Sequence, residues 1–259
     1  MDESKSYKII MEVLGLDIGG TGIKGAIVNT ETGVLLTERV RVLTPQPSTA
    51  ENMALTITEI IDKLDYRGEY IGVGFPTLIR KGIVQFTSNI DKSWLHVDIA
   101  KKFEELIGFK FFPLNDADAA GIAEAVYGKT KDRKGLVIFL TIGTGIGSAL
   151  IYDGKLIPNS EFGKVEFKGD SAEYYASNKT RKEKELSWKK FGKRLNEYLN
   201  YLDMLLSPSA FILGGGVSKK LEKYSPYLKT EVPVIPSEFL NAAGVIGAAY
   251  YAAKEVESK

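Results

Sequence analysis

LGLDIGGTGIKGAIV, residues 14–28, contains Gly20, Gly22 and Gly25 in the spacing G-x-G-x-x-G. In dinucleotide-binding turns a helix follows these glycines, because the pyrophosphate binds at the helix N-terminus. Here residues 26–28 read Ala-Ile-Val, which predicts a strand. The sequence also has no match to the P-loop pattern G-x-x-x-x-G-K-[ST]. The stretch therefore predicts a strand, a glycine turn and a second strand, which disfavours a nicotinamide-dependent oxidoreductase.

The same pattern recurs in the second half of the chain. A shift of 123 positions aligns the Gly-Thr-Gly of residues 20–22 with that of residues 143–145, where apolar strands again flank the turn. We therefore expect an α/β protein built from two lobes of similar topology, which face each other across a central cleft. The expected small N-terminal lobe comprises residues 9–114 with a C-terminal helix at 244–259, and the expected large lobe comprises residues 115–243.

Composition narrows the function classes. The 259 residues are 44% hydrophobic and 26% charged, and the net charge of +1 favours neither a nucleic acid nor an anionic membrane as partner. The sequence has no Cys and a single His, which excludes disulfides, zinc thiolates and multi-histidine metal sites. No run of about 18 apolar residues occurs, and the N-terminus is polar, so we expect a cytoplasmic protein with no membrane partner.

Glycine turns of this type can bind phosphate. Glycine lets backbone N–H groups approach an oxyanion closely, and threonine adds a hydroxyl donor. Asp17, directly before the first turn, is a candidate to hold Mg²⁺ through water, since this cation prefers carboxylates and water. The alternative is that these are ordinary tight turns. The candidate phosphate-binding residues are Gly19, Gly20, Thr21, Gly22, Lys24, Gly143, Thr144, Gly145, Gly214, Gly215 and Gly216.

Three segments now support a family resemblance. LDIGGTGIKGAIV, LTIGTGIGSALI and ILGGGVS resemble the phosphate-1, phosphate-2 and adenosine motifs of the actin/hexokinase/Hsp70 superfamily. Further segments, among them NDADAAGIAEAVYG, IPNSEFG and NAAGVIGAA, are similar to the ROK family of sugar kinases, above all to members that use polyphosphate to phosphorylate glucose. The resemblance implies a duplicated actin-like (ribonuclease H-like) fold, phosphoryl transfer to a sugar with Mg²⁺, and a homodimer.

The resemblance also assigns roles to residues. Asp116 would be the general base that accepts the proton of the attacking sugar hydroxyl, a role that suits one well-placed carboxylate. Taken alone, Asp116 or Asp118 is better explained as a cap of the following helix, and only the resemblance favours the base. The residues that match sugar-binding positions of relatives are Asn89, Asn115, Glu161, Lys164 and Glu173.

The chain departs from the family pattern at two positions of the sugar site. Relatives carry E-x-G-H, whereas residues 161–164 read Glu-Phe-Gly-Lys, and lysine donates hydrogen bonds but accepts none. Thr77 likewise stands where relatives have glycine. A sugar other than glucose is therefore an open alternative. No structural zinc is expected, because its Cys ligands are missing.

The sequence leaves alternatives open for the phosphoryl donor and for the class of function. Both ATP and inorganic polyphosphate fit the glycine turns. The densest basic stretch, residues 179–194, suits a polyanion but also reads as a solvated helix face. A non-catalytic sensor of sugar or phosphate is the second function class, which the retained Asp116 argues against.

Overall fold

The computed structural model describes residues 12–87 and 90–258. The chain divides into two compact units, Met1–Ala119 with Gly244–Lys259, and Ala120–Ala243. Helix α3 (Asp116–Val126) begins in the first unit and continues into the second. Among the described residues, no helix is long and apolar enough to cross a membrane.

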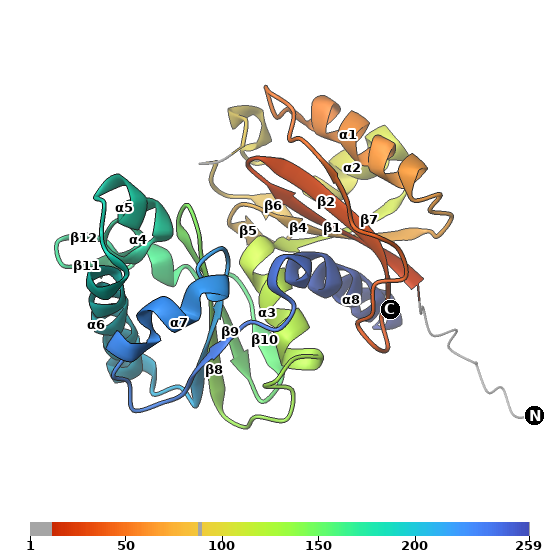
Figure 1. The fold of residues 1–259 in the computed structure, drawn as a ribbon. Coiled ribbons are helices and arrows are strands. Elements are labelled where there is room, and N and C mark those ends of the chain that lie inside the picture. Colours follow the sequence, from red (N-terminus) through yellow and green to blue (C-terminus); the bar gives the residue numbers. More distant parts are fainter. Residues whose placement is uncertain (1–11, 88–89, 259) are drawn as a thin grey trace, which may run out of the picture. The chain divides into compact units, whose positions relative to one another are not determined.

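Unit 1 is built on a five-stranded sheet in the order β3-β2-β1-β4-β7 (Figure 1). Strands β1 and β2 are antiparallel, whereas β4 and β7 run parallel to β1. The strands are β1 Glu12–Gly19, β2 Gly22–Asn29, β3 Val40–Val42, β4 Tyr70–Phe75 and β7 Lys110–Asn115, with a small hairpin of β5 Ile79–Arg80 and β6 Ile83–Val84. The helices are α1 Ala50–Lys63, α2 Ile99–Ile107 and α8 Ala243–Glu257.

Side-chain size alternates along the central strands of unit 1. Large residues of β1 and β4, such as Leu16 and Val73, are fully buried in one core with α1 and α2. The intervening glycines face the other side of the sheet, where α8 packs (Figure 1). A Cβ atom on Gly15 would lie 2.0 Å from the Val245 carbonyl oxygen, and one on Gly72 would lie 1.8 Å from the Ala248 oxygen. Because large residues alternate with glycines along these strands, one face of the sheet carries the hydrophobic core and the other allows a close contact with the α8 backbone.

Unit 2 repeats this topology. Its five-stranded sheet has the order β10-β9-β8-β13-β14, with β8 and β9 antiparallel and β13 and β14 parallel to β8 and to each other. The strands are β8 Leu136–Ile142, β9 Ile146–Tyr152, β10 Lys155–Ile157, β13 Ala210–Gly214 and β14 Val234–Pro236, with a small ladder of β11 Glu166–Phe167 and β12 Asp170–Ser171. The helices are α4 Ala172–Ala176, α5 Asn178–Glu183, α6 Trp188–Leu206 and α7 Leu221–Tyr224.

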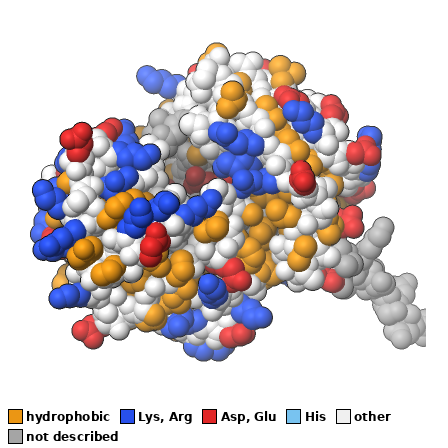
Figure 2. Space-filling model, viewed as in Figure 1, with side chains coloured by type: hydrophobic (Ala, Val, Ile, Leu, Met, Phe, Trp, Pro, Cys, Tyr) orange, Lys and Arg blue, Asp and Glu red, His pale blue; other side chains and the backbone are white. Residues whose placement is uncertain are grey.

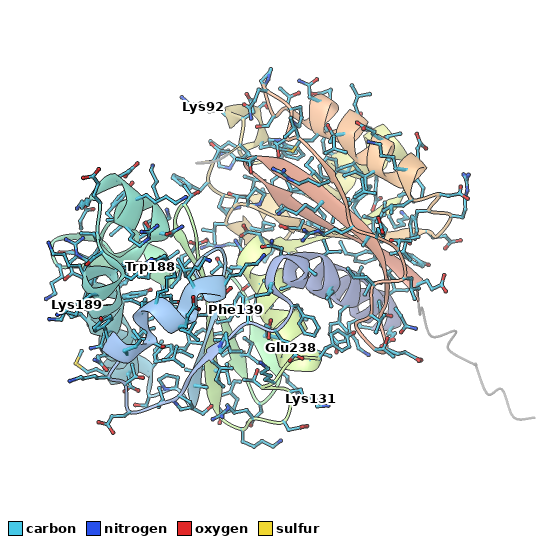
Figure 3. The ribbon with its side chains drawn as sticks, viewed as in Figure 1. Lys92, Lys131, Phe139, Trp188, Lys189 and Glu238 are labelled. Carbon is cyan, nitrogen blue, oxygen red and sulfur yellow. The ribbon has the colours of Figure 1, made fainter. Side chains whose placement is uncertain are left out.

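Helix α6 supplies the core of unit 2. Ser187 caps its N-terminus, and its apolar stripe packs against β8 and β13. Trp188 lies between α6 and α7 and stacks on Tyr224 at 5.9 Å between ring centroids, while Lys189 points away from the core (Figure 3). On the other face of the sheet, Gly121 of α3 lets the helix approach Ala149.

The two strand–turn–strand units predicted from the sequence are confirmed. Both glycine turns join two antiparallel strands, with Gly19 paired to Gly22 in one and Ile142 paired to Ile146 in the other. After residues 214–216 the chain forms only the four-residue helix α7, which Pro226 follows closely. Residues 9–11 of the expected N-terminal lobe lie outside the described residues.

Candidate active site

The candidate catalytic residue lies at the carboxyl edge of the unit 1 sheet. Strands β1, β4 and β7 are parallel, so their C-terminal ends meet at one edge, the place where open α/β sheets bind ligands. The first glycine turn follows β1, and Asp116 follows β7 directly. A Cβ on Gly74 of β4 would lie 3.5 Å from the Asp116 Cα, an ordinary van der Waals distance, so Asp116 lies directly beside the end of β4.

Asn115 forms the N-cap of α3. Its Oδ1 accepts hydrogen bonds from the backbone N–H groups of Ala117 at 2.8 Å and Asp118 at 3.2 Å. Its Nδ2 donates to the Thr77 carbonyl at 3.0 Å. Asp116 also accepts from Ala117 at 2.8 Å, but it is only half-buried, whereas Asp118 is buried. Because Asn115 supplies the cap, the cap does not account for a carboxylate at position 116.

Thr77 is buried rather than exposed toward a ligand. Its hydroxyl donates to the Phe86 carbonyl, and its own carbonyl accepts from Asn115. The residue that departs from the family pattern therefore joins β4 to the loop after β6. Asn89, the other polar residue predicted in this region, lies outside the described residues.

Asp17 and Lys24 form an ion pair beside the first glycine turn. They lie opposite each other in β1 and β2, and the Lys24 Nζ is 2.6 Å from the Asp17 Oδ2. The Asp17 side chain keeps 17% of its surface exposed. Gly244, at the start of α8, leaves the space beside it, since a Cβ there would lie 3.0 Å from the Asp17 carboxyl carbon. The carboxylate is thus held in place but still reachable from solvent.

Sequence reasoning missed two contacts of this turn. The Thr44 hydroxyl donates to the Gly19 carbonyl at 2.5 Å, and the Arg41 Nη2 donates to the Thr21 carbonyl at 3.2 Å. Arg41 lies on β3, directly opposite Lys24 on β2. The alternating RVRV of residues 39–42 was the available signal, but only the strand register connects it to the turn.

In unit 2 the two remaining glycine segments lie against each other. Strands β8 and β13 are parallel, so the turns at residues 143–145 and 214–216 leave the same edge of the sheet. Gly215 has a φ of +76°, and a Cβ on it would lie 2.6 Å from the Ile142 carbonyl oxygen. Only glycine fits this backbone conformation and this spacing.

Glu173 connects the second glycine turn to the residues that depart from the family pattern. Its Oε1 pairs with the Lys164 ammonium, and its Oε2 accepts from the Ile146 N–H at 3.3 Å. A Cβ on Gly145 would lie 2.3 Å from the same Oε2, so the glycine leaves the space that this carboxylate occupies. The Gly143 N–H is also used, by the Gly145 carbonyl at 2.9 Å. A carboxylate thus lies against part of the predicted phosphate-binding turn.

Glu161 completes an acidic cluster with one cation. Burial raises the pKa of Glu161 above its ordinary value, the nearby Lys164 lowers it, and Glu173 raises it. Two carboxylates share a single lysine, and Lys164 remains about half exposed, at 47%. The cluster offers several acceptors and one half-exposed donor, which suits the hydroxyl groups of a carbohydrate.

The basic stretch of residues 179–194 is spread over the surface of α5 and α6 (Figure 2). Two of its arginines pack on aromatic rings, Arg181 over Trp188 at 4.2 Å and Arg194 over Tyr175 at 4.7 Å. The Lys179 backbone N–H donates to the Gly143 carbonyl at 3.1 Å, which ties α5 to the second glycine turn. Most of the lysines in this stretch are exposed, as for a solvated helix face.

The fold and these motifs define a family. A ROK family profile matches residues 13–165, and the chain belongs to this family. A polyphosphate glucokinase from Mycobacterium tuberculosis (strain CDC 1551 / Oshkosh) is 43% identical over 91% of this chain and 89% of its own length.

Solved structures agree with this placement. The inorganic polyphosphate/ATP-glucomannokinase of Arthrobacter sp. strain KM matches with a TM-score of 0.90 and 44% identity, over 94% of this chain and 99% of that one. A ROK family glucokinase from Streptomyces griseus, in complex with glucose and AMPPNP, matches with a TM-score of 0.81 and 25% identity, over 94% and 99% of the two chains. The predicted duplicated actin-like fold is confirmed.

Proposed function

We propose that this protein is a sugar kinase that transfers a phosphoryl group from inorganic polyphosphate or ATP to the 6-hydroxyl of glucose or a similar hexose. The observation that carries the proposal is the position of Asp116, which follows β7 at the same sheet edge as the first glycine turn and Asp17. The names of the relatives, a polyphosphate glucokinase and a polyphosphate/ATP-glucomannokinase, support the same donors and the same class of acceptor.

The proposed reaction needs little covalent chemistry from the protein. The sugar oxygen forms a bond to the terminal phosphorus of the donor while the bridging P–O bond breaks. The hydroxyl proton passes to the Asp116 carboxylate, and the electron pair of the broken bond leaves with ADP or with a polyphosphate one unit shorter. Alignment and neutralisation of charge supply most of the rate. The backbone N–H groups of the glycine turns and the Lys24 ammonium would neutralise the negative charge of the donor phosphates.

Magnesium is part of the proposal, with Asp17 as its protein partner. No group of three or more metal-ligating side chains gathers within residues 12–87 and 90–258. Mg²⁺ is usually held by one or two carboxylates, water and the phosphates of the substrate. When bound, the ion neutralises charge on the transferring phosphates. Asp17, partly exposed at the sheet edge and paired with Lys24, would hold its hydration shell.

Asn115, Glu161, Lys164 and Glu173 are proposed to contact the sugar. Glu161 and Glu173 would accept from hydroxyls, and Lys164 would donate in place of the family's histidine. Asn115 can contribute one amide hydrogen, because only one of its two is used among the described residues. The homodimer implied by the family stays a prediction.

The direct test measures hexose 6-phosphate formed from glucose and Mg²⁺, with polyphosphate or ATP as the only phosphoryl donor. We expect product with polyphosphate and with ATP, and the same assay with mannose examines the effect of Lys164. A protein that binds sugar and donor but forms no product would be a sensor, the alternative function.

The charged cluster predicts how the pH dependence changes. If ionised Glu161 accepts from the sugar, kcat/KM for glucose falls as pH drops through the pKa of Glu161, which burial has raised. Lys164→Met removes the charge that lowers this pKa, so the acid limb should move to higher pH. Glu173→Gln removes a charge that raises it, so the limb should move to lower pH.

Steady-state rates of wild type and of both variants between about pH 4 and pH 8 locate the acid limb of each protein. Asp170→Asn, an exposed carboxylate on β12 of the same unit, serves as the control and should leave the limb in place. Shifts of the same sign in the two cluster variants would show that Glu161 does not control the limb.

A further inference from the structure

A row of charged side chains crosses the strands beside the first glycine turn. The register places Asp17 opposite Lys24, and Lys24 opposite Arg41. Like charges directly opposite each other destabilise a sheet, so an adjacent lysine and arginine need an explanation. Asp17 neutralises Lys24, but Arg41 forms no ion pair among the described residues. Figure 2 shows Lys and Arg side chains gathered over β1 and β2.

The two cations lie close to the two ends of the turn. A Cβ on Gly22 would lie 2.7 Å from the Arg41 Nε, and one on Gly19 would lie 3.9 Å from the Lys24 Nζ. Arg41 thus lies over Gly22 and hydrogen-bonds the Thr21 carbonyl at the tip. Between them, a Cβ on exposed Gly20 would meet no atom within 4 Å, which leaves room for a ligand.

We propose that Arg41 selects the phosphoryl donor by binding a phosphate of inorganic polyphosphate beyond those held by the glycine turn. This inference rests on the proposed kinase function and deepens it. Arg41 is exposed on β3, the edge strand of the sheet, so a chain that leaves the turn can reach its guanidinium. A guanidinium matches the spacing of two phosphate oxygens and stays charged at any working pH.

The two donors differ in what they offer to Arg41. Polyphosphate carries negative charge along its whole length, whereas the charge of ATP ends at its third phosphate and the adenosine is neutral. A cation at the outer side of the turn therefore attracts the long donor more strongly. Lys24, which is already paired with Asp17, would contact only the phosphates that both donors have in common.

The test compares Arg41→Gln with Arg67→Gln. Arg67 is also an exposed arginine of unit 1, but it precedes β4 and so lies at the opposite end of that strand from the turn. We expect Arg41→Gln to raise KM for long-chain polyphosphate about tenfold, in line with the loss of one charge-assisted hydrogen bond. KM for ATP should change less than about twofold, and Arg67→Gln should change neither value. Arg41→Lys should fall between wild type and Arg41→Gln.

Equal increases in KM for the two donors would overturn the proposal and make Arg41 a support for the turn. No change with polyphosphate would overturn it as well. Equilibrium binding of fluorescently labelled polyphosphate, with glucose 6-phosphate formation measured separately, keeps the two ideas distinct. Weaker binding in Arg41→Gln supports the site even if wild type forms no product, and unaltered binding rejects the site even if the kinase is active.

Discussion

Replacing Asp116 with asparagine is expected to lower kcat for sugar phosphorylation by roughly 10²–10⁴-fold, the usual contribution of a general base. Asparagine keeps the size and the polarity of the side chain but cannot take up the hydroxyl proton. Because Asn115 caps α3, the helix does not depend on the carboxylate at position 116 for its start. Binding of glucose and of donor should therefore change little.

Calorimetric titration with glucose, together with single-turnover rates, separates binding from chemistry. Asp62→Asn, on the exposed face of α1, is the control and should leave kcat unchanged. The loss of a negative charge in the first turn of α3 should cost at most about 1 kcal/mol of stability. An Asp116→Asn protein that retains near wild-type kcat would remove this residue from the chemistry and require another base.

Replacing Gly72 with alanine is expected to destabilise unit 1 by about 3 kcal/mol or more. The new methyl group would lie 1.8 Å from the Ala248 carbonyl oxygen and 2.9 Å from the Ala249 nitrogen, both backbone atoms of α8. Backbone in the middle of a helix cannot move aside without shifting the whole helix. The strand conformation itself accepts alanine, so the effect isolates this contact.

The two tryptophans make the measurement specific, because Trp94 is buried in unit 1 and Trp188 belongs to unit 2. In a Trp188→Phe background, denaturant unfolding followed by fluorescence reports on Trp94. Gly20→Ala is the matched control, since a Cβ there meets no atom within 4 Å, and its free energy of unfolding should stay within about 0.5 kcal/mol of the parent. If the Gly72→Ala protein were as stable as its parent, this would show that α8 does not pack tightly on β4.

The sequence was most informative where local chemistry repeats. The Gly-Thr-Gly segments at 20–22 and 143–145 predicted two strand–turn–strand units, and both sheets have this topology. The start of α3 could be placed after β7, although the residue that caps it, Asn115, is not one of the aspartates considered for that role. In each of these cases the signal lies within a few neighbouring residues.

Contacts between distant segments could not be predicted in this way. Arg41 reaches the first turn only through the pairing of β3 with β2, and a shift of register by one residue would place its side chain on the other face. Lys164 and Glu173 were each identified, but not the ion pair that joins them or the hydrogen bond from Ile146. Such contacts depend on loop paths that composition and periodicity do not specify.

The discontinuity of unit 1 has a consequence for biosynthesis. Residues 120–243 form unit 2 without interruption, whereas the unit 1 sheet needs α8, from residue 243 onward, to cover the face that carries Gly15 and Gly72. During translation, the ribosome therefore releases every residue of unit 2 before it releases the last helix of unit 1. Domains fold as their residues emerge from the ribosome. Unit 1, although its residues begin earlier in the sequence, is thus completed after unit 2. One face of its sheet stays uncovered until α8 has been synthesised.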